Sequence, residues 1–221
     1  MTTRARVRAV VVRDLKPVRP LWPAGVRLLM LVPIAIVVAL LGPLLGPRED
    51  IGQLGAVLAW GLWALQIAVG VLVLGAALDI AVPGSSVSSK RIGALVIAAS
   101  AVMLGITFTT YIKEPTVVPP QAGFWFWYVC LREPIKLGLP MLVVPLVLVM
   151  RAFPTSPGRV GALCGLAAGM FSDSGWRLAC WVSSPSHILN SHFLAVLVLT
   201  LGGSALAVGI DYLRTILLPK R

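Results

Sequence analysis

Charged residues are scarce in this sequence, and acidic residues are scarcer than basic ones. Only 12% of its 221 residues are charged and 58% are hydrophobic, whereas a soluble domain carries about 25% charged residues. Eight Asp and Glu stand against 19 Lys and Arg, which gives a net charge of +11. The shortage of charge excludes an ordinary soluble domain and predicts helices that span a membrane.

Cysteine and histidine are also rare, with three and two residues, and no Cys-x-x-Cys pair occurs. A membrane thiol-disulfide oxidoreductase usually works through such a pair, or through a second redox pair and an electron acceptor. A membrane thiol-disulfide oxidoreductase is therefore kept only as an alternative function. A small-molecule transporter is the other alternative, because several apolar runs contain proline and Gln66 falls near the middle of one. However, the sequence shows no repeated halves and few charges inside those runs.

Six long apolar runs are present, each close to the length that a membrane helix needs. They cover about residues 28–45, 53–80, 92–112, 135–150, 160–181 and 193–213. The prolines inside them are tolerated in membrane helices, where neighbouring groups satisfy the freed carbonyls. The runs predict an all-α integral membrane protein, a bundle of six transmembrane helices. Two connecting segments, residues 113–129 and 182–192, are expected to be loops, the first of them with the interfacial aromatic cluster 123–128.

The distribution of Lys and Arg predicts how the bundle is oriented. The amino-terminal segment, loops 81–91 and 151–159 and the carboxy terminus carry 7, 2, 2 and 3 basic residues, against five in the alternate segments. Because cytoplasmic loops are the basic ones, both termini are expected in the cytoplasm. The organisation is then a cytoplasmic segment 1–27, a transmembrane domain 28–213 and a cytoplasmic tail 214–221. Charge spread along one membrane edge also argues against direct binding of nucleic acid.

The amino-terminal segment contains the stretch Asp-Leu-Lys-Pro-Val-Arg-Pro-Leu-Trp-Pro at residues 14–23. Three prolines in ten residues disfavour a helix and favour an extended arm. About 27 residues are too few to build their own core, so such an arm would become ordered on contact with a partner. A basic segment beside anionic lipid is the plainer interpretation, but the composition of residues 14–23 favours a protein-binding arm.

The predicted orientation places Cys130 and Cys180 at the outer face, with His187 and His192 in the following outer loop. Thiolates and imidazoles bind ions such as zinc, cadmium and copper. Two thiols in an oxidising compartment can instead form a disulfide, and accessible thiols can respond to oxidants. The residues alone leave metal binding and disulfide chemistry open. Cys164 lies well inside the fifth run and is expected to be a packing residue.

The fifth run carries two further patterns. Gly161, Gly165 and Gly169 recur every fourth residue and predict a close approach of another helix. Asp173 and Arg177 are four residues apart, so they share a helix face and can form a pair. A charge pair inside a span is either functional or structural, and both interpretations stay open. Gln66 is expected to make an interhelical hydrogen bond.

Several of these features together resemble the NrsF family of membrane anti-sigma factors, negative regulators of an extracytoplasmic-function sigma factor of the sigma F type. They are the stretch 14–21, six spans, the loop Arg-Ala-Phe-Pro-Thr-Ser-Pro at 151–157 and Gly-Leu-Ala-Ala-Gly at 165–169. The resemblance covers nearly the whole chain. It implies a multi-pass protein of the bacterial inner membrane that is not an enzyme and has no resident cofactor.

The resemblance also implies roles for particular residues. The sigma factor would be bound by the amino-terminal segment, through Asp14, Leu15, Lys16, Pro17, Val18, Arg19, Pro20 and Leu21. Cys130 and Cys180 would sense heavy metals such as chromate and cadmium and so cause release of the sigma factor. Many family members have His immediately before the second cysteine, whereas this chain has Ala179. His187 or His192 would then complete a set of metal ligands.

Overall fold

The computed structural model describes residues 21–85, 87–113 and 123–217, and all regular structure in these ranges is helical. The predicted all-α fold is therefore confirmed. The long helices are α2 (Ala24–Leu45), α4 (Ala56–Ile80), α5 (Ser89–Lys113), α6 (Gly123–Met150), α7 (Pro157–Arg177) and α9 (Leu194–Leu217). The short elements are α3 (Ile51–Leu54), α8 (Pro185–His187) and the π-helix η2 (Ile188–Phe193).

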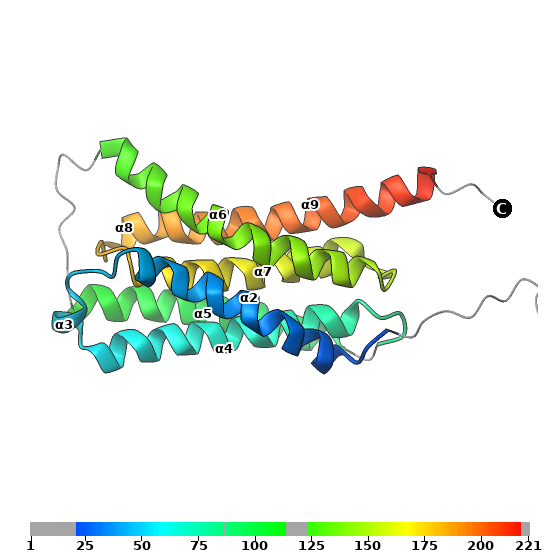
Figure 1. Cartoon of the computed structure of the whole chain (residues 1–221), viewed down its shortest axis with the longest axis horizontal. Coiled ribbons are helices and arrows are strands. Elements are labelled where there is room, and N and C mark those ends of the chain that lie inside the picture. Colours follow the sequence, from blue (N-terminus) through cyan, green and yellow to red (C-terminus); the bar gives the residue numbers. More distant parts are fainter. Residues whose placement is uncertain (1–20, 86, 114–122, 218–221) are drawn as a thin grey trace, which may run out of the picture.

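Helix α7 occupies the centre of the bundle and packs against α2, α4, α6 and α9. Figure 1 shows the long helices running along one common direction, with the start of α2 and the end of α9 at the same end. The loops after α4 and after α6 lie at that end too. The segments that are richest in Lys and Arg thus border one end of the bundle. That this end faces the cytoplasm stays a prediction.

Five helical segments among the described residues are long and apolar enough to cross a membrane. They are Ala24–Leu45, Ala56–Ile80, Ser89–Lys113, Phe126–Met150 and Pro185–Leu217. Helix α7 has 21 residues but is less apolar, because it carries Ser172, Asp173, Ser174 and Arg177 in its last turns. Most of its residues are buried by neighbouring helices, so few of them would meet lipid. The structure supports a multi-pass membrane protein, and the count of six spans stays a prediction.

Small residues allow α7 to lie very close to two neighbours. A Cβ atom built on Gly161 or Gly165 would overlap the backbone of α9, and one on Gly169 would overlap Val196. The predicted glycine stripe is thereby confirmed as a helix contact. A second close contact, not predicted, joins α7 to α2: a Cβ atom on Gly175 would lie 2.6 Å from the carbonyl oxygen of Ala39. Side chains at these positions would force the helices apart.

The predictions of two loops, residues 113–129 and 182–192, are wrong in part. Helix α6 begins at Gly123, so the aromatic run 123–128 belongs to the helix rather than to a loop ending at residue 129. The residues favour a helix because they pair at a spacing of four. The rings of Phe124 and Tyr128 stack with centroids 6.4 Å apart, and Arg132 lies over Tyr128 at 5.5 Å.

The polar segment 182–192 is the second correction, since it becomes helical from Pro185 onward. A proline at the first position of a helix is favourable, because its missing N–H would have no partner there. Polar residues suggested exposure, but His187, Ser191 and His192 are buried. The preceding helix also ends earlier than expected, at Arg177 instead of residue 181.

Candidate thiol and imidazole site

Cys180 lies in the irregular segment 178–184, which joins α7 to α8, and this segment is fixed to the end of α2 by Arg48. The backbone N–H of Arg48 donates to the carbonyl of Leu178 at 2.8 Å. Its guanidinium donates to the hydroxyl of Ser183 at 3.1 Å and to the carboxylate of Asp50 at 2.6 Å. Arg48 is only 6% exposed. The backbone around Cys180 is therefore held to α2 as well as to α7.

Cys130 reaches the same place from α6, and its Sγ atom lies 3.7 Å from that of Cys180. The two thiols are 3% and 5% exposed and form a small apolar cluster with Val182, Phe126 and Trp176. All three cysteines lie in the described ranges, and none of them forms a disulfide there. Two residues fifty positions apart in the sequence are thus in direct side-chain contact, and both are buried rather than on an open surface.

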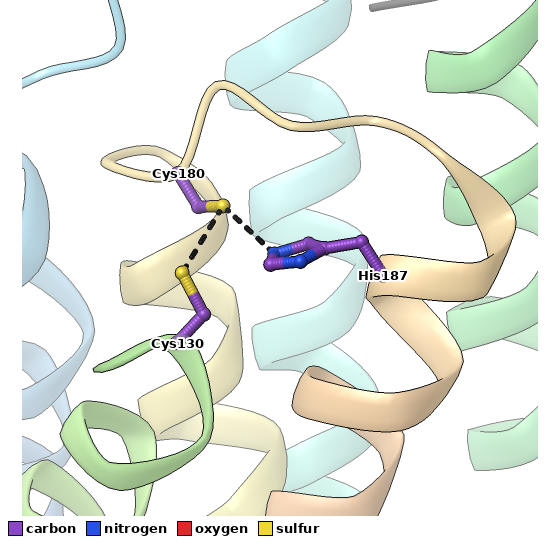
Figure 2. A group of neighbouring side chains, drawn as sticks. All are labelled: Cys130, Cys180 and His187. Atoms are coloured by element: carbon purple, nitrogen blue, oxygen red, sulfur yellow. Dashed lines mark hydrogen bonds between the residues drawn. The ribbon is translucent and has the colours of Figure 1, made fainter. Parts of the chain in front are cut away.

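His187 completes a compact group of three. Its Nε2 atom lies 3.5 Å from Cys180 Sγ, and its ring is 5.5 Å from that of Phe126. Figure 2 shows Cys130 and His187 approaching Cys180 from α6 and α8, with the three polar atoms directed toward one another. These ligand atoms all lie within 4.8 Å of one another. The residues are buried, so an ion held among them would be shielded from solvent.

The spacing of this group suits a tetrahedral metal ion. Zinc lies about 2.3 Å from thiolate sulfur and about 2.0 Å from imidazole nitrogen. At tetrahedral angles these lengths put two sulfurs about 3.8 Å apart, and a sulfur and a nitrogen about 3.5 Å apart. The observed separations are 3.7 Å for the sulfurs and 3.5 Å for Cys180 and His187. Chelation would therefore need little movement of these two pairs.

The Cys180 thiol is protonated at neutral pH in this environment. Its hydrogen bond with Cys130 and its burial raise the pKa of the Cys180 thiol above its ordinary value of 9.0, an effect that the nearby imidazoles partly offset. A thiol must lose its proton to bind a metal. The site consequently favours a strongly thiophilic ion over a hard one, since only strong binding by sulfur offsets the loss of the proton.

His192 lies behind this group and does not belong to the close cluster. It is fully buried, its ring centroid is 5.6 Å from that of His187, and its Nδ1 atom is 2.7 Å from Asp173 Oδ1. Within the described part of the chain, Nε2 of His192 has no hydrogen-bond partner. A carboxylate on one ring nitrogen fixes the tautomer and leaves the other nitrogen as a ligand. His192 is thus a candidate fourth ligand at longer range.

Asp173 is the centre of a buried polar network that links four elements. Its carboxylate accepts from Arg177 Nε at 2.8 Å and from Gln66 Nε2 at 2.7 Å, in addition to the contact with His192. Arg177 also donates to the hydroxyl of Thr107 at 3.3 Å. The predicted pair of Asp173 and Arg177 and the interhelical bond of Gln66 are confirmed. A network that spans α4, α5, α7 and η2 fixes the helices relative to one another.

A small cavity of about 30 Å³ lies between this network and the thiols. Its lining includes Arg48, Gln66, Arg177, Cys180 and His192. The cavity connects the two polar groups, so a change at Cys180 would be felt by side chains of several helices. Sequence spacing could not predict this connection. Asp173 and His192 are much more than four positions apart, so the rule for neighbours on one helix face does not apply to them.

The other predicted site residues lie elsewhere. Residues Asp14, Leu15, Lys16, Pro17, Val18, Arg19 and Pro20 are outside the described ranges. Leu21, the last of the predicted sigma-binding stretch, is 43% exposed just before α2, at the end of the bundle opposite the thiols. Cys164 is completely buried within α7, in the main hydrophobic core, as expected for a packing residue.

Comparison with known proteins identifies one family. A family model described as NrsF, negative regulator of sigma F, matches residues 11–210. The match includes Cys130, Cys180, both histidines and the whole proline-rich stretch 14–23. No curated protein and no solved structure matches the chain.

Proposed function

The chain belongs to the NrsF family, the negative regulators of sigma F, and we propose on this premise that it is a membrane-bound anti-sigma factor. It would hold an extracytoplasmic-function sigma factor at the bacterial inner membrane and keep it from the polymerase. The family role is regulatory rather than catalytic. Five apolar helices support a multi-pass location, and the excess of basic residues at one end supports cytoplasmic termini.

The sigma factor would be bound by the arm that precedes α2, chiefly by Asp14 to Leu21. Support for this comes from the exposure of its last apolar residues, since Leu21 and Trp22 are 43% and 54% exposed. Helix α2 begins at Ala24, so deletion of residues 1–23 leaves the first span whole. Loss of the sigma factor from membranes that still contain the shortened chain is the expected result. A complex that survives the deletion would contradict this assignment.

The cluster of Cys130, Cys180 and His187 is the observation that best supports a sensing role. A heavy-metal ion would displace the two thiol protons and draw α6 and the 178–184 segment onto a common centre. Oxidation would use the same two sulfurs, but it would not need His187. The imidazole 3.5 Å from Cys180 favours a metal ion as the signal. Because only metal binding needs His187, a substitution of His187 distinguishes metal binding from oxidation.

Cadmium binding to the purified full chain in reductant, followed by the thiolate-to-metal absorption band, tests this role. Cys130→Ser and Cys180→Ser should each abolish the band. His187→Ala should weaken binding by more than the about 10- to 100-fold that loss of a group supporting a ligand costs, because it removes a ligand itself, while oxidation to a disulfide should persist. Cys164→Ser is the matched control and should bind as the wild type does. Binding that is indifferent to His187 would leave disulfide formation as the signal.

We infer that α2 transmits the change to the arm, because the loop that follows α2 contacts the thiol segment through Arg48, and the start of α2 continues into the arm. Arg48 fastens the end of α2 to Leu178 and Ser183, and the close contact at Gly175 fastens α2 to α7. A coupling claim requires an element that both sites bias. Here that element is the position of α2 relative to α7.

A further inference from the structure

A second cavity lies at the opposite end of the bundle from the thiols, between the start of α2, the end of α4 and the start of α5. Its volume is about 620 Å³, and its lining includes Trp22, Arg27, Asp79, Val82, Ser85 and Arg91. The lining combines two arginines with apolar side chains. A cavity of this composition suits a ligand that has both an anionic group and an apolar part.

Arg27 is the unusual residue of this cavity. It is only 4% exposed, and its Nη2 atom donates to the carbonyl of Leu78 at 3.0 Å. Its Nε and Nη1 atoms are buried without a hydrogen-bond partner among the described residues. Asp79 lines the same cavity, yet the ion pairs of the described ranges do not include one between these two residues. Two donors of this guanidinium therefore lack a partner, and because both are closed off from solvent, a small movement of the side chain would be needed to present them to an anion in the cavity.

The amino terminus of α2 adds further donors at the same place. Pro23 precedes the helix, no side chain of the described residues caps it, and its first turn contains no acidic residue. The first N–H groups of a helix have no partner inside the helix, and the helix dipole favours negative charge beside them. Helix amino termini with these properties bind phosphate groups. Ala24, which begins α2, lines the cavity together with Arg27.

We propose that this cavity binds the phosphate group of an anionic phospholipid. The phosphate would accept hydrogen bonds from Arg27 and from the first turn of α2, and Arg91 would add a second positive charge. A membrane lipid fits better than a free anion because Leu21, Trp22, Val82 and Val87 offer apolar surface beside the arginines. Tryptophan is also enriched at the level of lipid headgroups. The site goes beyond the regulation of a sigma factor and requires only that the helices lie in a bilayer.

Such a lipid would sit at the root of the predicted sigma-binding arm, since Leu21 and Trp22 both line the cavity and lead directly into α2. Basic sites between membrane helices on the cytoplasmic side are known to hold anionic headgroups. The bound lipid would fix the first turn of α2 to the loop after α4. The composition of the membrane would thereby influence how the arm leaves the bundle.

Competition between two lipids in the purified full chain tests the proposal. The protein in a neutral detergent receives equal amounts of phosphatidylglycerol and phosphatidylcholine, and native mass spectrometry counts the lipids that it retains. We expect phosphatidylglycerol to be retained about five-fold over phosphatidylcholine for each arginine that contacts it. Arg27→Gln should remove most of this preference, and Arg91→Gln should reduce it.

Two further variants separate a lipid site from a general loss of fold. A Cβ atom at Gly25 would meet no described atom within 4 Å, and a carboxylate in the first turn of a helix is stabilising. Gly25→Glu should therefore fold well and yet lose the preference for phosphatidylglycerol. Arg159 is exposed at the same end of the bundle, outside the cavity, so Arg159→Gln should retain the preference.

The results that would overturn the proposal are equally specific. Equal retention of the two lipids by the wild type would exclude the site. The same loss in Arg159→Gln as in Arg27→Gln would show only general attraction of charge. Displacement of phosphatidylglycerol by excess inorganic phosphate would assign the site to a soluble anion instead of a lipid.

Discussion

The two ends of this bundle are built in opposite ways. At one end the thiols, the imidazoles and the carboxylate of Asp173 are almost completely buried. The cavity between the thiols and the network of Asp173 has a volume of only about 30 Å³. At the other end a cavity of about 620 Å³ opens beside Leu21 and Trp22. A closed site with few solvent contacts suits selective chemistry with a small ion. An open site beside the exposed Leu21 and Trp22 suits reversible binding of larger partners.

Helix α2 makes the comparison instructive, because it takes part in both ends. Arg48, in the loop just after α2, is bound to the segment of Cys180, and Arg27 near the start of α2 is bound to the end of α4. Internal contacts therefore hold the helices more firmly at the end with the thiols than at the other end. Substitutions there should cost folding stability, whereas substitutions at the other end should change binding with little effect on folding.

The largest effect is expected for Asp173→Ala at the closed end. The change would leave Arg177 and His192 buried without their carboxylate, and breaking a buried pair costs about 3–5 kcal/mol. Thermal unfolding of the detergent-solubilised protein measures this loss of stability. Glu49→Ala, an exposed acid at the same end, is the control and should stay within about 0.5 kcal/mol of wild type. Equal effects of the two variants would show that the network does not stabilise the bundle.

A smaller loss of stability is expected for Gly165→Ala, where the added Cβ atom would overlap the backbone of Leu199. Overpacking of this kind costs about 1–3 kcal/mol. Gly202→Ala is the matched control on α9, because a Cβ atom there meets no described atom within 4 Å. It should be neutral or stabilising by up to about 1 kcal/mol. The same unfolding assay checks both, and a stable Gly165→Ala would contradict the close packing of α7 and α9.

A change at Arg48 should weaken transmission of the signal, in addition to any loss of stability from its ion pair with Asp50. Arg48→Gln loses the side-chain hydrogen bonds to Asp50 and Ser183 but keeps the backbone bond to Leu178, so the thiol segment would be coupled less firmly to α2. The sigma factor should still co-purify, but cadmium should induce the sigma-dependent genes less strongly. Arg159→Gln provides a control for loss of charge. Normal induction in Arg48→Gln would show that the signal bypasses α2.

The smallest effect concerns pH. Folding raises the pKa of the Cys180 thiol above 9.0 through its hydrogen bond with Cys130 and its burial. The resulting contribution to stability is fully present below the pKa of the unfolded thiol and is lost as pH rises toward the folded value. The comparison is made in a Cys130→Ser background, so that burial alone raises the pKa of Cys180: Cys130→Ser should lose more unfolding temperature than Cys130→Ser/Cys180→Ser between neutral pH and pH values above 9.0. Equal losses of unfolding temperature in the two proteins would show that folding does not raise the pKa of the Cys180 thiol.

Much of the fold follows from the sequence, because long apolar runs can satisfy their backbone groups in a membrane only as helices or as a closed barrel. The spacing of Asp173 and Arg177 was enough to predict their pairing. Spacing could not show that His192 shares the same carboxylate, since that contact depends on how η2 folds back against α7. Polarity also misled: His187 and Ser191 suggested an exposed loop, although protein groups rather than solvent surround them.

The site was only half predictable for a similar reason. Two predicted spans, residues 135–150 and 160–181, separate Cys130 from Cys180 in the sequence, so the pattern could place both cysteines on one side. It could not show that the two sulfurs are in contact, nor that His187 rather than His192 lies closest to Cys180. Those facts depend on the irregular segment 178–184 and on its attachment to Arg48.

Release of the sigma factor from sealed vesicles is the most direct measurement of the central claim. Vesicles would contain the full chain with the sigma factor bound at the side of the amino terminus, and cadmium would be added at the other side. The account predicts release from the wild type and from Cys164→Ser, and retention in Cys130→Ser and Cys180→Ser. Equal release from all four proteins, or release only when cadmium reaches the amino-terminal side, would contradict it.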